Sequence, residues 1–214
     1  VSKNLWLSLA SAALSLVFIF NPSNSMFGGN FYSTLAGEFC YSFALSLFVF
    51  YIGVLIDTFK NRKEPFLAGI LLGLIGLSHL FVFMPALVAA FFFIFAPIIQ
   101  NIKLKKDDES VPKKELYDKK NSIKYFGLII ITAFLLMAFW LVPLLAKREF
   151  STGISMIWTY QSFYYFFIQS TLWLLVPVLI VSIILFIKSP KHRVFAGFSI
   201  FTFIMCLFFY FTAA

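Results

Sequence analysis

The sequence predicts an all-α fold, a polytopic bundle of transmembrane helices with about 7 spans. Of its 214 residues, 61% are hydrophobic and 12% are charged, and the mean hydropathy is +0.93. A soluble domain carries about twice that charged fraction. Several apolar runs approach or exceed the roughly 18 residues of a membrane-spanning helix. They do not alternate apolar and polar residues as the strands of a membrane β-barrel do.

Seven apolar segments build this predicted fold, at 5–20, 39–56, 65–82, 84–100, 125–145, 169–187 and 194–213. The third and fourth segments come from one run without formal charge, from Pro65 to Gln100. As one helix this run would be about 54 Å long, whereas two crossings of a bilayer core need about 60 Å. We therefore predict a short hairpin at 65–100, whose arms are slightly shorter than the core.

The basic residues favour two crossings in this run. With two crossings and Lys3 inside, the inner segments hold all 17 Lys and Arg residues except Lys147 and Arg148. Such an excess of positive charge is typical of cytoplasmic loops. The pattern predicts a multi-pass protein of the plasma membrane with cytoplasmic lysine-rich loops, among them the charged loop 101–124. The net charge of +8 then reflects anchors beside the lipid bilayer, and no nucleic acid is expected as a partner.

The same topology leaves only two acidic residues facing outward, Glu38 and Glu149. Glu38 stands directly at the entry of a predicted span, behind Ala36-Gly37. A carboxylate at a membrane edge is costly unless it has a partner or a task. It is a candidate active-site acid, and the alternative is a hydrated side chain that the dipole of the following helix favours.

His79 lies in Leu-Ser-His near the tip of the predicted hairpin. A polar pair in an apolar run should face protein or a wet cavity. His79 could bind a phosphate or donate a hydrogen bond to a reacting oxygen. The alternative is a structural histidine that bonds a neighbouring backbone carbonyl. We expect Glu38 and His79 to share one outward-facing cavity.

Two further groups of residues lie on the predicted outer face. Lys147 and Arg148 follow a span directly, against the positive-inside trend, which suggests an anionic ligand such as a lipid phosphate. Tyr160 belongs to the aromatic run 158–167, and aromatic rings stack on sugars. Membrane anchoring by the two cations and an interfacial belt of aromatic residues are the alternatives.

The sequence lacks GxxxxGK[ST], HExxH, GxSxG and any metal-ligand cluster. The predicted spans also contain almost no ionisable residue apart from His79. This weighs against a proton-coupled transporter, which needs carboxylates inside the membrane.

The chain resembles a family in three segments, GGNFYSTLAGEFCYSFALSLFVFYIGVL, LAGILLGLIGLSHLFVFMPALVAAFFF and AFWLVPLLAKREF. They are similar to multi-spanning bacterial and archaeal membrane proteins labelled 6-pyruvoyl-tetrahydropterin synthase-related. The matching elements are the AGEF entry into a span, the Leu-Ser-His hairpin and the Trp-x-x-Pro exit. They come in the expected order between Gly28 and Phe150, and the three segments together make up about one-third of the chain.

The architecture of that family resembles the glycosyltransferases of the C type (GT-C), which take sugars from polyprenyl-phosphate carriers at the outer membrane face. The resemblance implies a lipid-linked sugar donor as partner and Glu38 as an acidic active-site residue. It further implies that His79 contacts phosphate or supports a residue that does, and that Lys147 and Arg148 clamp the lipid phosphate. Some members require a divalent metal ion, so a metal cofactor is possible, with no ligand assigned.

The resemblance has one departure. The catalytic Asp of such enzymes follows their first span, and no Asp of this chain faces outward. Since the chain begins with Val1 and ends inside an apolar run, we expect residues 1–214 to be one transmembrane domain cut from a longer protein, with that Asp upstream. The alternatives are that Glu38 substitutes for the Asp or that the protein is no enzyme. The alternative function is a non-catalytic membrane component of polysaccharide or lipid export, or a transporter.

Overall fold

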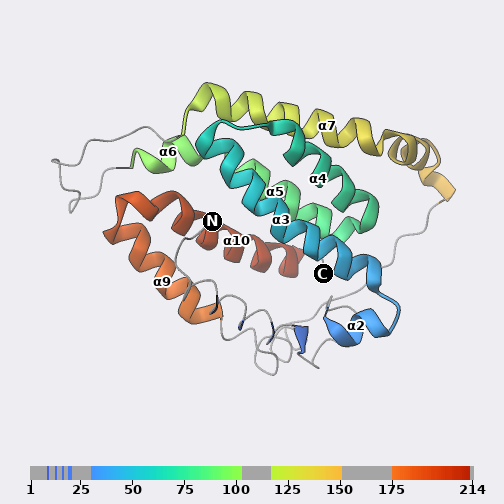
Figure 1. Cartoon of the computed structure of the whole chain (residues 1–214), viewed down its shortest axis with the longest axis horizontal. Helices are drawn as coiled ribbons and strands as arrows, with labels where there is room; N and C mark the ends of the chain where they lie inside the picture. Colours follow the sequence, from blue (N-terminus) through green and yellow to red (C-terminus); the bar gives the residue numbers. More distant parts are fainter. Residues whose placement is uncertain are drawn as a thin grey trace.

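Figure 1 shows the computed structural model of the chain, which describes residues 30–102, 117–150 and 175–212 together with Leu9, Ala13, Leu16, Ile19 and Phe20. All regular elements in this described part are helical, so the all-α prediction is confirmed there, while the number of spans stays a prediction. The helices are α2 (Phe31–Leu35), α3 (Phe39–Asn61), α4 (Pro65–Ser78), α5 (Leu80–Phe92), α6 (Ala96–Gln100), α7 (Lys119–Ala146), α9 (Leu175–Lys188) and α10 (Arg193–Thr212), with 3-10 turns η2 (Arg148–Phe150) and η4 (Pro190–His192).

Helices α4 and α5 form a hairpin whose tip is His79 (Figure 1). At the tip, the His79 ring lies 4.5 Å from the ring of Tyr41 near the start of α3. At the other end of α5, the Phe93 ring stacks 5.2 Å from that of Phe59 near the end of α3. Helix α5 therefore runs parallel to α3, and α4 runs antiparallel to both.

The hairpin differs from its prediction in where it turns and how long its arms are. The boundary was expected between 82 and 84, but the helix breaks at His79, whose backbone is extended (φ −160°, ψ 116°). A break there leaves Pro85 near the start of α5, and not deep inside a continuous helix where its ring would clash. The arms have 14 and 13 residues, or about 21 Å and 20 Å, well short of a bilayer core of roughly 30 Å.

Helix α7 lies against α4 along a seam of three glycines, Gly69, Gly73 and Gly76. A Cβ at Gly69 would come within 2.5 Å of Thr132 Cβ, and one at Gly73 within 2.8 Å of Leu136 Cδ2. Glycines spaced in this way let two helix backbones approach closely, as is common between membrane helices. Because the contacts advance together along both helices, α4 and α7 are parallel and begin at the same end of the bundle.

The chain on either side of residues 103–116 is held together at that end. The Gln100 side-chain amide donates to the Tyr117 carbonyl at 2.6 Å, and the Tyr117 N–H donates back to Gln100 Oε1 at 3.1 Å. Asp118 then caps α7 by accepting from the Lys120 N–H at 3.2 Å. Burial raises the pKa of Tyr117 to about 12.

Helices α9 and α10 join the bundle through Arg193, whose side chain is fully buried. Its Nε donates to the Phe186 carbonyl at 3.0 Å, and its Nη1 donates to the Ile102 carbonyl. The Phe198 ring, one turn into α10, lies 5.3 Å from that of Phe92 at the end of α5. A buried guanidinium needs such acceptors, and here they fix the start of α10 beside the end of the hairpin.

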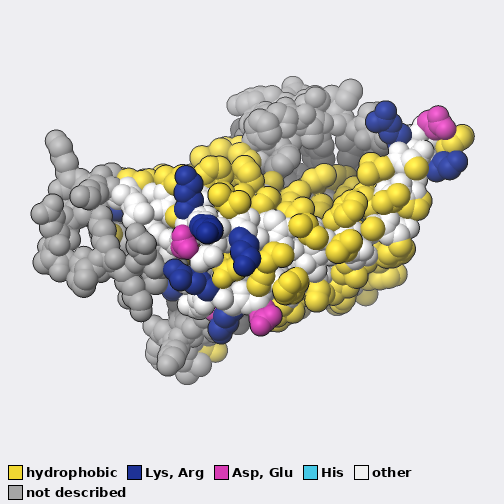
Figure 2. Space-filling view, turned by 90° about the horizontal axis from the view of Figure 1, so that it is seen from above, with side chains coloured by type: hydrophobic (Ala, Val, Ile, Leu, Met, Phe, Trp, Pro, Cys, Tyr) yellow, Lys and Arg dark blue, Asp and Glu magenta, His cyan; other side chains and the backbone are white. Residues whose placement is uncertain are grey.

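These contacts define two ends of the bundle. The basic end is where α3, α6 and α9 finish and α4, α7 and α10 begin, and it carries Lys60, Arg62, Lys63, Lys119, Lys120, Lys124, Lys188 and Arg193. The tip end is where α3 begins, the hairpin turns and α7 finishes, and its charged residues are Glu38, Lys147, Arg148 and Glu149. Figure 2 shows most Lys and Arg side chains gathered toward one end of an apolar surface. The grouping of charges inferred from the sequence is thus present in the described residues.

Two helices in the described part are long and apolar enough to cross a membrane, α3 (Phe39–Asn61) and α7 (Lys119–Ala146). Only 17% of the most apolar window of each is buried. Their outward faces carry large apolar side chains, such as Val49 on α3 and Phe139 on α7, both 74% exposed. Shorter apolar helices, among them α4 and α5, accompany them.

Candidate functional site at the hairpin tip

The approach to the site is the short helix α2, which the sequence places directly before Glu38. Asn30 caps α2 by accepting from the Ser33 N–H at 2.9 Å. Two bonds close the other end: the Gly37 N–H donates to the Thr34 carbonyl at 3.2 Å, and the Glu38 N–H donates to the Ser33 carbonyl at 3.0 Å. This is a Schellman ending, with glycine at the left-handed position that favours it.

Gly37 serves the turn of the backbone and does not make room for a neighbouring group. Gly37 has φ +106°, and a Cβ there would meet nothing within 4 Å. Glycine is therefore required by backbone conformation, because the chain must turn sharply between α2 and α3.

Glu38 is the residue on which α3 begins. Its carbonyl accepts from the N–H groups of Tyr41 at 3.2 Å and Ser42 at 3.3 Å, but its side chain makes no capping bond. The carboxylate is half-buried. A hydrogen bond between the hydroxyls of Thr34 and Ser42 ties α2 to the first turn of α3 beside it. The helix dipole favours the carboxylate where it stands, and its oxygens remain available to a ligand.

His79 is held by its backbone and by aromatic rings. Its N–H donates to the Ile75 carbonyl at 2.8 Å, and its carbonyl accepts from Val82 and Phe83 at 3.1 Å each, so it ends α4 and starts α5. The rings of His79 and Tyr41 meet edge to face, with an interplanar angle of 86°. Nδ1 of His79 is buried without a hydrogen-bond partner among the described residues. The expected structural alternative, a bond to a neighbouring carbonyl, is therefore not made at Nδ1.

An unpartnered nitrogen at this position needs a physical reason. Buried polar atoms are nearly always hydrogen-bonded, and each exception suggests a water, an ion or a ligand that satisfies it. Depending on the tautomer, Nδ1 can accept a hydrogen bond or donate one. It can therefore serve either a hydroxyl or a phosphate oxygen.

Tyr41 is the residue of this site that sequence reasoning missed. It lies one turn after Glu38 on α3, and its ring packs against His79, so it connects the two candidates. The predicted topology already placed the start of α3 and the hairpin tip at one end, and this was the available signal. Whether Glu38 and His79 share a cavity stays a prediction, since no bond between their side chains is found within the described residues.

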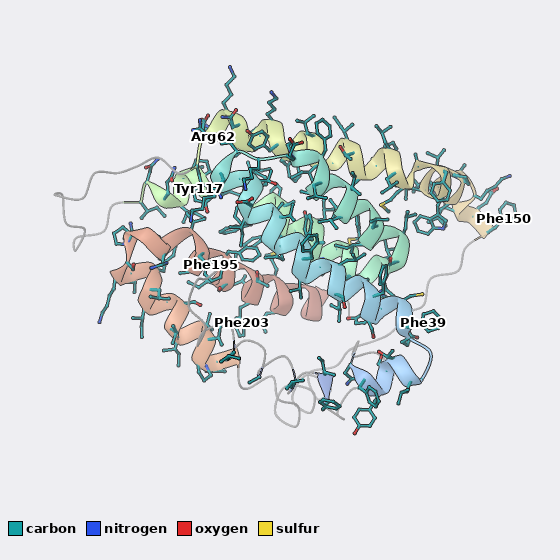
Figure 3. The ribbon with its side chains drawn as sticks, viewed as in Figure 1. Phe39, Arg62, Tyr117, Phe150, Phe195 and Phe203 are labelled. Carbon is teal, nitrogen blue, oxygen red and sulfur yellow. The ribbon has the colours of Figure 1, made fainter. Side chains whose placement is uncertain are left out.

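Lys147 and Arg148 lie at the tip end, but on the end of α7. Lys147 places its Nζ 5.8 Å from the centre of the Phe150 ring, and both cations are exposed. In Figure 3, Phe150 at the end of α7 and Phe39 at the start of α3 occupy separate corners of the same end. A single site would thus need a ligand long enough to bridge the two corners. Tyr160, the other predicted binding residue, lies outside the described residues.

No group of three or more His, Cys, Asp or Glu side chains that could hold a metal ion occurs within the described residues. A divalent metal therefore has no assigned ligand in this part of the chain, and its involvement stays a prediction. One other polar atom in the described part is buried without a partner, the hydroxyl of Tyr51 in the middle of α3.

Comparisons of this chain with protein-family models, with curated proteins and with solved structures found no match. The resemblance described above is therefore a proposal, and function has to be argued from the residues and their geometry.

Proposed function

We propose that the chain is the transmembrane part of a multi-pass plasma-membrane protein of about seven spans, with its basic end in the cytoplasm. Support comes from α3 and α7, which are long and apolar enough to cross, and from the apolar faces that they leave exposed. The separation of charge between the two ends is the pattern of cytoplasmic and outer loops. A hairpin with short arms fits this topology when its tip stays below the outer surface of the membrane.

We further propose that the full-length protein is a C-type glycosyltransferase-like enzyme, related to the 6-pyruvoyl-tetrahydropterin synthase-related membrane proteins. It would transfer a sugar from a polyprenyl-phosphate carrier at the outer face. The observation that supports this proposal is that Tyr41 lies next to each of the two candidate residues. Glu38 lies one turn before Tyr41 on α3, and the His79 ring contacts the Tyr41 ring.

In the proposed reaction, each candidate residue has a role. An acceptor hydroxyl attacks the anomeric carbon, its proton passes to a carboxylate, and the bond to the carrier phosphate breaks with its electron pair on phosphate oxygen. Glu38 would orient the acceptor or take its proton. His79 would stabilise the departing phosphate, and Lys147 and Arg148 would hold the lipid phosphate. Tyr160 would stack on the sugar.

The second candidate is a non-catalytic component of polysaccharide or lipid export. The placement of Lys147 and Arg148 favours it, because they stand on the exposed end of α7 and Lys147 contacts Phe150. In such a protein the cations would anchor α7, and Glu38 would stay hydrated at the start of α3.

The test is transfer from a lipid-linked sugar by the full-length protein. We expect Glu38→Gln and His79→Ala each to lower the rate by about 100-fold or more, as loss of an acid–base or phosphate contact does. Glu149→Gln is the matched control, because it removes the other carboxylate of the tip end, which is exposed. Rates equal to wild type in folded Glu38→Gln and His79→Ala proteins would remove both residues from the site, whereas no transfer by the wild-type protein would favour the non-catalytic candidate.

Sidedness is tested separately by cysteine labelling. Cys40 and Cys206 are first replaced by serine, and a single cysteine is then placed at Glu149 or at Lys63. A membrane-impermeant maleimide added to intact cells should label the Glu149→Cys protein and spare the Lys63→Cys protein until the cells are opened. Labelling of Lys63→Cys in intact cells would overturn the proposed orientation.

A further inference from the structure

The basic end contains a compact group of cations that the proposed reaction does not use. We call it the α3–α7 basic patch: Lys60, Arg62, Lys63, Lys119, Lys120 and Lys124. The patch comes from two segments far apart in sequence. The Phe59 ring lies 6.3 Å from that of Tyr125, edge to face, which holds the end of α3 beside the start of α7. Figure 2 shows several Lys and Arg side chains gathered on one part of the surface.

The charge of the patch is poorly neutralised by the protein itself. All six cations are exposed, and within the described residues only Lys63 forms an ion pair, with Asp57 at 3.0 Å. Lys119 and Lys120 occupy the first turn of α7, which has no acidic residue. The acidic cap Asp118 directly precedes these two lysines, and the helix dipole itself disfavours cations at this end of α7.

Apolar side chains lie directly beside the patch. Phe66 follows Lys63 at the start of α4 and is 53% exposed, and Ile123 precedes Lys124 on α7 and is also 53% exposed. Cations next to an exposed apolar surface match the boundary between lipid headgroups and acyl chains. There a basic side chain gains most from anionic headgroups within a Debye length.

We infer that the α3–α7 basic patch binds the headgroups of anionic phospholipids in the leaflet at the basic end. This rests on the membrane location proposed above, but not on glycosyl transfer. The three lysines of α7 supply half of the cations of the patch, so replacing them is the most direct test of the inference. Lys120 and Lys124 are one turn apart and lie on the same side of the helix.

The experiment measures lipids retained by the purified full chain in detergent, by native mass spectrometry, after addition of phosphatidylglycerol or phosphatidylcholine. Wild type should retain phosphatidylglycerol preferentially, and salt at 0.5 M should weaken this preference. The triple variant Lys119→Gln, Lys120→Gln, Lys124→Gln should lose about fivefold in affinity for each lysine removed. The same three positions changed to arginine keep the charge and should keep the preference.

Equal retention of the two lipids by wild type would overturn the inference. So would retention of phosphatidylglycerol by the triple glutamine variant at the wild-type level, or a wild-type preference that does not respond to salt. The salt series needs no variant, so it decides even where the glutamine protein does not fold. Release of the chain from membranes by alkaline carbonate would instead refute the membrane location, whereas a chain that stays inserted without lipid preference refutes only the patch.

Discussion

The α4–α7 seam and the hairpin tip are both contacts of α4, yet they are built in opposite ways. Along the seam, glycines bring two helices so close that a single added carbon would collide with Thr132 or Leu136. At the tip, a few residues further along the same helix, the His79 ring packs on Tyr41 while its Nδ1 has no described partner. The seam serves helix packing alone, whereas the tip holds a polar nitrogen that can still form a hydrogen bond.

The difference indicates which residues to test for stability and which for function. In a membrane, helices associate through close van der Waals contact, because lipid is as apolar as leucine. A seam without side chains maximises that contact. A polar ring with an unsatisfied atom contributes little to it, so its presence at the tip calls for another reason.

The largest effect is expected from filling the seam. Gly69→Leu places a side chain against Thr132 Cβ and the Ile129 carbonyl, which are rigid neighbours at 2.5 Å and 3.0 Å. We expect a loss of about 3 kcal/mol or more, because overpacking at backbone contacts cannot be relieved by side-chain rotation. Thermal unfolding of the purified protein in detergent measures it. Gly53→Leu on α3 is the matched control, since nothing lies within 4 Å of its Cβ position.

A smaller loss is expected where the chain turns into the tip. Gly37→Ala meets no steric obstacle but forces a non-glycine residue to φ +106°. We expect a cost of about 1–2 kcal/mol, concentrated in α2 and the start of α3. Hydrogen exchange of the amides of residues 31–42 measures it. Gly127→Ala, in the middle of α7 with open space at its Cβ, should instead be neutral or stabilising, and a loss there equal to that at Gly37 would contradict this account.

The next prediction has the opposite sign and concerns the two unpartnered polar atoms. Tyr51→Phe and His79→Phe each remove a buried group that has no described partner. Each should leave stability unchanged or raise it by about 1 kcal/mol, because the cost of desolvation disappears with the group. Only His79→Phe should also abolish sugar transfer. Destabilisation by His79→Phe would mean that Nδ1 has a structural partner, and the contrast between seam and tip would then fail.

The smallest effect is expected from the bond between α2 and α3. Ser42→Ala removes the hydroxyl that bonds Thr34 on the exposed side of the tip. The expected loss is about 0.5 kcal/mol, typical of one exposed hydrogen bond. Ser46→Ala is the control, since Ser46 Oγ only donates to the Ser42 carbonyl of its own helix at 3.0 Å. Thermal unfolding of both variants should give the difference, and equal midpoints would show that this bond does not hold α2.

Sequence patterns predicted the hairpin and the grouping of charges, since both depend on hydrophobicity and on where lysines fall. They placed His79 near the tip of the hairpin, which the structure confirms, but they did not predict the helix break at His79 itself, because nothing in Leu-Ser-His signals an extended residue. The spacing of Gly69 and Gly73 was readable as a helix-packing motif, but its partner α7 depends on tertiary contacts. The link from Glu38 to His79 through Tyr41 depends on the rotation of α3 about its axis, which an apolar run of this kind does not specify.

The bonds between Gln100 and Tyr117 also matter for protein engineering. They hold the ends of the intervening segment side by side, at 2.6 Å and 3.1 Å. A folded reporter whose termini are close together could therefore be inserted at residues 103–116 without moving α6 away from α7. The same position is a natural place to divide the gene into two halves, because their products would meet again across this pair of hydrogen bonds.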